Sequence, residues 1–501
     1  MKEVTPTCKG KLHYHSFTIV YFHLFQIGKD SEIRLKEGYV DSSPGKIDSQ
    51  IFDSTSVGKK QLIKRYKLKD FGFKIKLYQR DDSPLISGRV FIEAARFFDS
   101  TVSLTYRLMV DQISTEEKVN YTTDDLIALA GILLGNEHWN TGQNANSTSI
   151  DTDIESMDIE DLYIDKNGNL QKEPEHLSGK KEIFSQVLMR YKRLITQNKS
   201  VYQSNDLFYV MADIWEDIGH SDSFEFDKVT EPEVINHILD RHKPELMGLF
   251  TQYPGEWVYR DPDFFEDICG GNIAIDTDDL ILCNENICVV FGTYGKRGGE
   301  GAETDWQQHL KEREFFHVSW PEYMAILELL LARKQLVGVL HDTYKNIIDD
   351  FKPGNETVIE TIANKSLDVN NALLKMDALK FSRIISHRHM YRKTAEQLRI
   401  SEEFAELNAT AACIENQIAN LKSIKEKRES DKLTGLLAII SGLSILQFFF
   451  LPLEIPILKS IAPHTDLGKT VASVIDFLCT VLFVVGFVLI IRFVIKIIRK
   501  K

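Results

Sequence analysis

Hydrophobic and polar positions divide this chain into a long mixed region and a short, almost wholly apolar end. Two apolar runs stand near the C-terminus: residues 433–453 carry no charge, and residues 471–491 carry only Asp476. Each run holds about 20 residues, which as a helix spans the roughly 30 Å hydrocarbon core of a bilayer. The pattern predicts two transmembrane helices. The alternative, a pair of core helices in a soluble domain, fits less well because such helices rarely lack charge on every face.

Lys and Arg set the expected orientation of these two spans. They cluster before the first run and after the second, whereas the interval between the runs has only Lys459 and Lys469. By the positive-inside rule, both termini are cytoplasmic and the short interval lies outside. The sequence therefore predicts a two-span protein of the cell inner (plasma) membrane, with membrane lipid as one partner.

The chain before residue 433 alternates between strand-like and helix-like patterns. Runs rich in β-branched and aromatic residues predict strands at residues 17–27, 88–91, 101–110 and 207–211, and a hairpin over 273–291 that turns at 284–286. Helical spacing predicts helices over residues 124–134 and 182–196. A third helix is expected to start at Ser319, with Glu322 completing a capping box, and to stop at 352–354.

These elements predict an α/β cytosolic domain followed by a long α-helical stalk and two C-terminal transmembrane helices. The expected order is an N-terminal α/β part, an acidic polar insertion, a second α/β part, a helical region with a coiled-coil-like stalk, and a two-helix transmembrane domain with a basic tail. The corresponding ranges are 1–140, 141–181, 182–318, 319–432 and 433–501.

The stalk prediction rests on a stretch from Asn355 to Thr434 that contains neither Gly nor Pro. Within it, apolar residues recur in alternating steps of four and three, as in the a/d seam of a coiled coil. The alternative is a single amphipathic helix that packs on its own domain. The residues of this seam are Ile400, Phe404, Leu407, Ala411, Ile414, Ile418 and Leu421.

Composition excludes several classes of function. Lys and Arg number 60 against 73 Asp and Glu, a formal net charge of −13, so a broad basic face and direct nucleic-acid binding are not expected. The six cysteines are scattered and predict neither disulfides nor a zinc site. His387 and His389 point apart on a helix, and no HExxH, GxSxG or kinase motif occurs, so the chain is not expected to be an enzyme.

Two sets of residues are candidates for binding or transport. The glycine-rich loop at residues 292–301 carries Lys296 and Arg297 and would bind a small anionic ligand through its phosphates; the alternative is a flexible surface loop. Ser441, Ser444 and Gln447 form a polar stripe on the first predicted span. Asp476, near the outer end of the second span, is either the mouth of a cation path or an interfacial residue beside the headgroups.

The order of a cytosolic α/β domain, a stalk without Gly or Pro, two C-terminal spans and a basic tail resembles the CorA family of magnesium transporters. The resemblance implies a homo-oligomer, pentameric in that family, whose first span lines a pore. It covers the layout of residues 320–501. The Gly-Met-Asn signature of the family is absent where residues 448–456 read FFFLPLEIP, so no site residue and no metal ligand is transferred.

With its large cytosolic part, the chain looks more similar to the divergent CorA-like proteins associated with type III CRISPR systems. That resemblance implies an antiviral membrane effector or ion channel gated by a nucleotide second messenger, with an adenine nucleotide as the expected ligand. Two alternatives stay open: a constitutive transporter of divalent cations such as Mg²⁺ or Co²⁺, and a membrane-anchored binding protein that conducts nothing.

Overall fold

The computed structural model describes fourteen segments and scattered positions near the C-terminus. These are residues 12–27, 40–42, 63–76, 85–97, 101–110, 119–131, 149–152, 182–183, 191–192, 206–220, 229–252, 256–292, 318–350 and 384–407, with single positions and short pieces between 409 and 492. The chain divides into two compact units. We call Met1–Phe351 with Glu356–Asn408 the sheet domain, and Lys352–Asn355 with Ala409–Lys501 the C-terminal unit.

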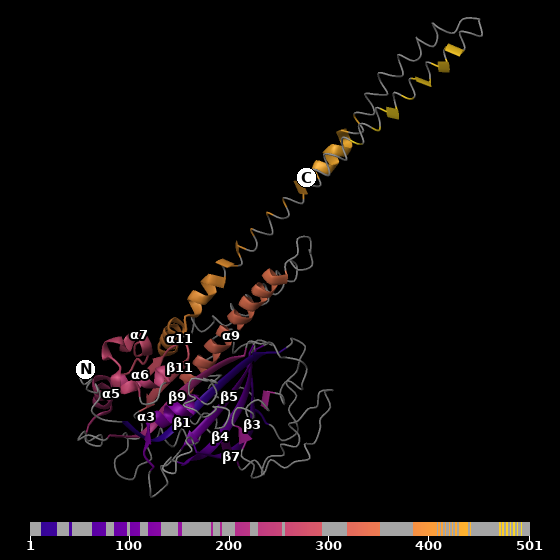
Figure 1. The fold of residues 1–501 in the computed structure, drawn as a ribbon. Helices are drawn as coiled ribbons and strands as arrows, with labels where there is room; N and C mark the ends of the chain where they lie inside the picture. The colour runs from indigo at the N-terminus through magenta and orange to yellow at the C-terminus, as the bar shows by residue number, and fades with distance from the viewer. Residues whose placement is uncertain are drawn as a thin grey trace, which may run out of the picture. The chain divides into compact units, whose positions relative to one another are not determined.

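The described strands of the sheet domain form one mixed sheet in the order β10-β11-β9-β1-β5-β4-β3-β7-β8, with β2 paired to β3 and β6 paired to β1 (Figure 1). Its pairs are antiparallel except for β11 and β9, which run parallel. The strands are β1 (Leu12–Gln26), β2 (Val40–Ser42), β3 (Ile63–Lys76), β4 (Leu85–Phe97), β5 (Thr101–Val110), β6 (Tyr121–Thr122), β7 (Ser149–Thr152), β8 (Glu182–Ile183), β9 (Leu207–His220), β10 (Asp279–Cys283) and β11 (Ile287–Gly292).

Helices cover both faces of this sheet. The described helices are α3 (Thr123–Gly131), α5 (Glu231–Arg241), α6 (Lys243–Thr251), α7 (Phe265–Cys269), α9 (Pro321–Asp350) and α11 (Ile385–Gln397), with short 3₁₀ turns η6 (Glu256–Tyr259) and η7 (Pro262–Phe264). Tyr21 of β1 donates a hydrogen bond to the Leu129 carbonyl of α3. Thr105, which pairs with Phe22 of β1, donates to Glu328 of α9. Because neighbouring residues of a strand point to opposite faces, α3 and α9 lie on opposite sides of the sheet.

The two faces of the sheet differ in polarity. The face towards α3 and α6 is apolar, with Phe17, Ile19 and Tyr21 of β1 in one buried cluster with Leu126 and Leu246. The face towards α9 buries charged and polar side chains, among them Arg65, Glu93, Arg107, Asp213 and Glu328. A strand covered on both faces reads as a nearly continuous apolar run, which explains why β1 was recognisable in the sequence.

The α/β prediction is confirmed for the sheet domain. The strands predicted at 17–27, 101–110 and 207–211, the hairpin over 273–291 and the long helix that begins after Ser319 are all present. The helix predicted from residue 182 is wrong at its first two residues, because Glu182 and Ile183 pair with β7. The strands β9, β10 and β11 lie in the same sheet as β1, although about 180 residues of sequence separate the end of β1 from the start of β9.

The described residues of the C-terminal unit are helical. Among these described residues, no helix is both long enough and apolar enough to cross a membrane. The two apolar runs are described only in part, so the two predicted spans stay a prediction. Large apolar side chains at the described positions of these runs are 41–68% exposed: Leu433, Leu436, Leu437, Val471, Val474, Phe477, Leu478, Val481, Val484, Val485 and Val488.

Candidate functional site

Near its C-terminal end, the sheet domain contains a break between two helices. Helix α11 ends at Gln397, and the chain is helical again from Ile400. Between them Arg399 has φ +53°, in the left-handed region that side chains with a Cβ avoid at a cost of about 1–3 kcal/mol. The N–H of Arg399 donates to the Glu396 carbonyl (3.0 Å), and the Glu403 N–H donates to the Arg399 carbonyl (3.0 Å). Arg399 therefore closes one helix and starts the next, which is the beginning of the predicted stalk.

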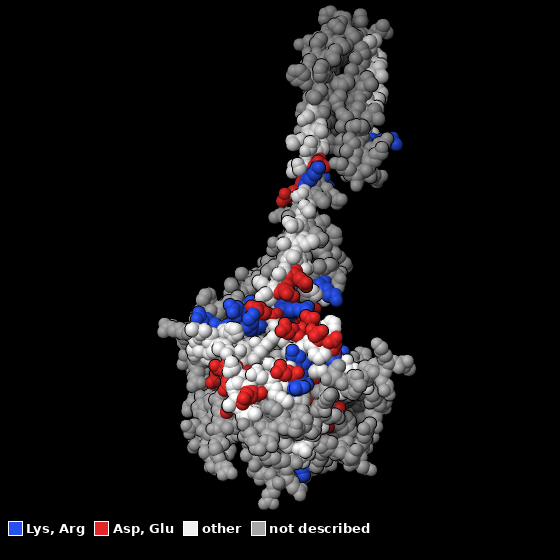
Figure 2. Space-filling view, turned by 90° about the vertical axis from the view of Figure 1, so that its left-hand side faces the viewer, with Lys and Arg blue, Asp and Glu red and all other residues white. Residues whose placement is uncertain are grey.

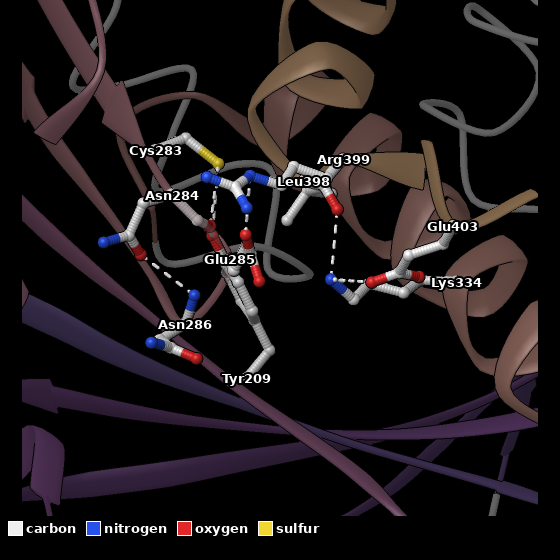
Figure 3. A network of polar contacts seen from close by, with 9 residues as sticks. All are labelled: Tyr209, Cys283, Asn284, Glu285, Asn286, Lys334, Leu398, Arg399 and Glu403. Carbon is white, nitrogen blue, oxygen red and sulfur yellow. Dashed lines mark hydrogen bonds and ion pairs between the residues drawn. The ribbon is translucent and has the colours of Figure 1, made fainter. Parts of the chain in front are cut away.

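Two ion pairs and one hydrogen bond hold this break in place (Figure 3). Arg399 Nε lies 2.8 Å from Glu285 Oε1, in the turn between β10 and β11. Lys334 Nζ, on α9, donates to the Leu398 carbonyl (3.0 Å) and lies 2.9 Å from Glu403 Oε1. We call Glu285, Lys334, Leu398, Arg399 and Glu403 the joint. It connects the edge of the sheet, helix α9 and the first turn of the stalk helix.

The β10–β11 turn that carries Glu285 is itself well fixed. The side-chain oxygen of Asn284 accepts hydrogen bonds from the N–H groups of Asn286 (2.9 Å) and Ile287 (3.0 Å). Its side-chain N–H donates to the Ile268 carbonyl (3.1 Å). An Asn that bonds to the backbone two and three residues ahead is a common way to hold a turn. Glu285 is therefore presented to Arg399 from a turn with little freedom.

A buried chain of hydroxyl and thiol groups lies beneath the joint. Tyr209 of β9 donates to the Asn284 carbonyl (2.9 Å), and its hydroxyl is 3.1 Å from the Cys283 sulfur. Cys288, directly opposite Cys283 in the hairpin, donates to the Tyr323 hydroxyl of α9 at 3.7 Å. Thr394 of α11 donates to the same hydroxyl (3.2 Å). Burial raises the pKa of the Tyr209 and Tyr323 phenols well above the usual value, so both stay neutral near pH 7.

Helix α9 is anchored to the sheet at its first turn. The backbone N–H and the hydroxyl of Ser319 both donate to the carboxylate of Asp213, in the middle of β9. Ser319 thus contacts another element directly before the helix, and α9 begins at Pro321. Asp213 is fully buried, and this burial raises its pKa to about 7, against the opposing effect of the two Ser319 hydrogen bonds.

A second buried anchor lies further along α9 and consists of charges. Glu328 Oε2 lies 2.7 Å from Nη1 of Arg65 on β3, and Glu328 Oε1 accepts a hydrogen bond from the Thr105 hydroxyl at 2.8 Å. Glu93 lies 3.3 Å from Arg107 and 3.7 Å from Arg65. The four charged side chains are at most 2% exposed and sum to zero charge. Helix α9 is therefore held to β3, β4 and β5 by a neutral cluster shielded from water.

The candidate residues from the sequence differ in whether the structure describes them and in how buried they are. Ser441 is helical and exposed; Lys296, Arg297, Ser444, Gln447 and Asp476 lie outside the described residues. In the seam, Ile400 and Leu407 are each 1% exposed within the sheet domain and Phe404 is partly buried. This burial is what the alternative, a single helix packed on its own domain, predicts. The other seam residues, Ala411, Ile414, Ile418 and Leu421, lie outside the described part of the chain, and their role stays a prediction.

The described part of the chain contains no candidate metal site. No group of three or more His, Cys, Asp or Glu residues there is placed to hold an ion. His387 is buried, whereas His389 is partly exposed. Burial lowers the pKa of His387, and the negative charge of Glu322 acts in the opposite direction.

The sequence patterns missed the joint and the Asp213 anchor. Asp213 was detectable in principle, because it is a lone acid inside the apolar run LFYVMADIW. The joint carried no local signal, since its members come from three segments far apart in the chain. Comparison with protein-family models, with curated proteins and with solved structures gives no match to this chain.

Proposed function

We propose that this chain is an oligomeric membrane effector of CorA-like layout, in which a ligand on the cytosolic sheet domain controls an ion path formed by the C-terminal runs. One observation carries the proposal. The large apolar side chains at the described positions of both runs are 41–68% exposed in a single copy. Contiguous apolar surface of this kind marks contact with a membrane or with other chains.

The joint supports the coupling between the two parts of the chain. Its contacts hold the first turn of the stalk helix to a turn of the sheet and to α9. A change in the sheet domain that moves the Glu285 turn or α9 would therefore alter the contacts at the start of the stalk. We propose that a ligand-driven change would pass from the sheet domain to the stalk helix at these contacts, as coupling between two sites requires.

The free energy needed to gate such a channel can be compared with that of the ion pairs at the joint. Shifting a channel from about 1% to about 99% open takes roughly 5.5 kcal/mol of differential binding. Shared among the five copies that the CorA resemblance implies, this is about 1 kcal/mol per copy. Exposed ion pairs contribute about 0.2–1 kcal/mol each, and the Arg399–Glu285 pair is of this kind, at 64% and 41% exposure. At the upper end of this range, one such pair per copy comes close to the roughly 1 kcal/mol that each copy must contribute.

The ligand that we propose is a small anionic signal, an adenine nucleotide acting as a second messenger in type III CRISPR antiviral defence. The proposal rests on the overall resemblance and on the glycine-rich loop with Lys296 and Arg297, for which the sequence leaves a phosphate site and a flexible surface loop as alternatives. Replacing both residues with Ala tests this assignment in the same assay as the function itself.

The test is ion flux through the purified full-length chain in liposomes, with and without linear and cyclic adenine nucleotides. We expect flux only when a nucleotide is present. Flux that needs no nucleotide and follows Mg²⁺ or Co²⁺ would instead favour a constitutive transporter. Absence of flux in every condition, with biological activity lost on disrupting the seam at Ile414 but not on replacing Ser441, Ser444 or Asp476, would favour a non-conducting anchor.

A further inference from the structure

The sheet domain leaves large apolar side chains exposed at two places. Among its described residues, six such side chains are exposed, and all but Val119 belong to two short segments. Tyr259, Phe264 and Ile275 are 50–59% exposed around α7. Ile384 and Ile385, at the start of α11, are 41% and 71% exposed. Scattered single apolar residues need no explanation, but a concentration of this kind does.

Opposite charges surround these two groups. Residues 261–278 contain six acids and no Lys or Arg: Asp261, Asp263, Glu266, Asp267, Asp276 and Asp278. We call this segment, with Tyr259, the acidic patch. On α11, the exposed residues Arg388 and Arg392 follow Ile385 at steps of three and four, which places all three on one side of the helix. We call these residues, with Ile384, the basic patch.

The two patches do not satisfy each other within one copy. In the described residues, no ion pair joins Arg388 or Arg392 to the acidic patch. The partner of Arg392 is Glu396, on its own helix, at 4.0 Å. Ile385 at 71% exposure and Phe264 at 56% also cannot be covering one another. Figure 2 shows that one face of the molecule exposes both basic and acidic side chains.

We infer that the acidic patch of one copy binds the basic patch of another copy of this chain. Each patch combines exposed apolar side chains with charges mainly of one sign, although Lys243 Nζ lies 5.6 Å from the Phe265 ring of the acidic patch and Glu396 pairs with Arg392 of the basic patch. Apolar residues bordered by charges are the arrangement found in protein interfaces. The opposite signs make each patch the complement of the other, and like patches would repel. A contact between two unlike patches can repeat around a closed ring, the usual form of a homo-oligomer with such interfaces. The inference rests on the proposed oligomer and assigns a contact to it.

Charge reversal tests the contact in the full-length chain in detergent or nanodiscs, by mass photometry over a dilution series. We expect R388E/R392E and D263K/E266K each to raise the dissociation concentration at least tenfold. When all four reversals are combined in one chain, the dissociation concentration should return to within about threefold of its original value. K64E/K74E, a matched reversal at exposed lysines of β3, should leave it unchanged. No effect of either reversal, or no recovery in the combination, would overturn the inference.

Crosslinking between differently tagged copies gives an independent readout. One copy carries I385C, the other F264C, and both carry C413S because Cys413 is exposed. A short bismaleimide should join the two tags, and a pair with V119C in place of F264C should not be joined. Because neither experiment measures flux, a chain that assembles without these patches contradicts this inference alone. A chain that assembles through them but conducts nothing contradicts the proposed channel alone.

Discussion

The hydroxyl and the backbone N–H of Ser319 both bond to the buried carboxylate of Asp213, so the first turn of α9 is fixed to the centre of β9. Two donors favour the charged carboxylate, but its complete burial has the larger effect and raises its pKa to about 7. Stability near neutral pH should therefore depend on the protonation of this one group.

The Asp213 anchor predicts how stability changes with pH. An unfolded Asp titrates near pH 4, so between about pH 4 and 7 the folded chain binds a proton that the unfolded chain has lost. The contribution of this group to the free energy of unfolding therefore falls as pH rises through that window. Asp213→Asn keeps an acceptor for Ser319 and should remove this pH dependence. Above pH 8 its free energy of unfolding should therefore exceed that of the original chain by up to about 4 kcal/mol.

Urea denaturation at pH 5 and pH 8 measures this difference. Asp263→Asn, at an exposed position, is the matched control and should keep the pH dependence of the original chain. An unchanged pH dependence in Asp213→Asn would show that Asp213 does not titrate in this range.

The left-handed backbone at Arg399 predicts an unusual order of stability between two variants. Both Arg399→Gly and Arg399→Ala remove the Glu285 ion pair, so their difference reports the backbone alone. The Gly variant should be more stable than the Ala variant by about 1 kcal/mol, because Gly adopts positive φ without a steric cost. At Arg392, inside α11, the Ala variant should instead be more stable than the Gly variant, by a similar amount. Thermal unfolding measures both pairs, and the same order at the two positions would contradict the φ of Arg399.

The buried charge cluster predicts a large cost for removing one charge. Glu328→Gln leaves Arg65 buried without its nearest carboxylate and should lower the free energy of unfolding by about 3–5 kcal/mol. Asp70→Asn, which breaks the exposed Arg89–Asp70 pair, should cost less than about 1 kcal/mol. Chemical denaturation separates the two cases. A cost for Glu328→Gln as small as that for Asp70→Asn would mean that the cluster is open to water.

The seam residues predict two separable effects along one helix. Leu407 is 1% exposed within the sheet domain, so Leu407→Ala should lower the free energy of unfolding of that domain by about 2–5 kcal/mol. Ile414→Asp, further along the predicted seam, should weaken assembly and leave the unfolding of the sheet domain unchanged. Unfolding curves and mass photometry on the same samples distinguish the outcomes, and the reverse assignment would contradict the division of roles.

Local pattern was enough to identify β1, β5, β10, β11, parts of β4 and β9, and the long helix, whereas β2, β3, β6, β7 and β8 were not predicted. Strand β5 and helix α9 were predicted closely because each has continuous apolar periodicity that packing does not override. The break at Arg399 could not be predicted, since that stretch has neither Gly nor Pro and only tertiary contacts hold its left-handed residue. The same applies to the joint, whose Glu285, Lys334 and Glu403 look like ordinary surface charges in the sequence.

The central place of β1 has a consequence for how the chain is made. Residues 12–24 of this strand pair with β9, which leaves the ribosome only after about 190 further residues have been added. At roughly 5–20 residues per second, a strand that is almost wholly buried in the fold waits on the order of 10–40 s for its pairing with β9. During synthesis this unpaired strand edge is open to aggregation, and we expect chaperones to bind the nascent chain there.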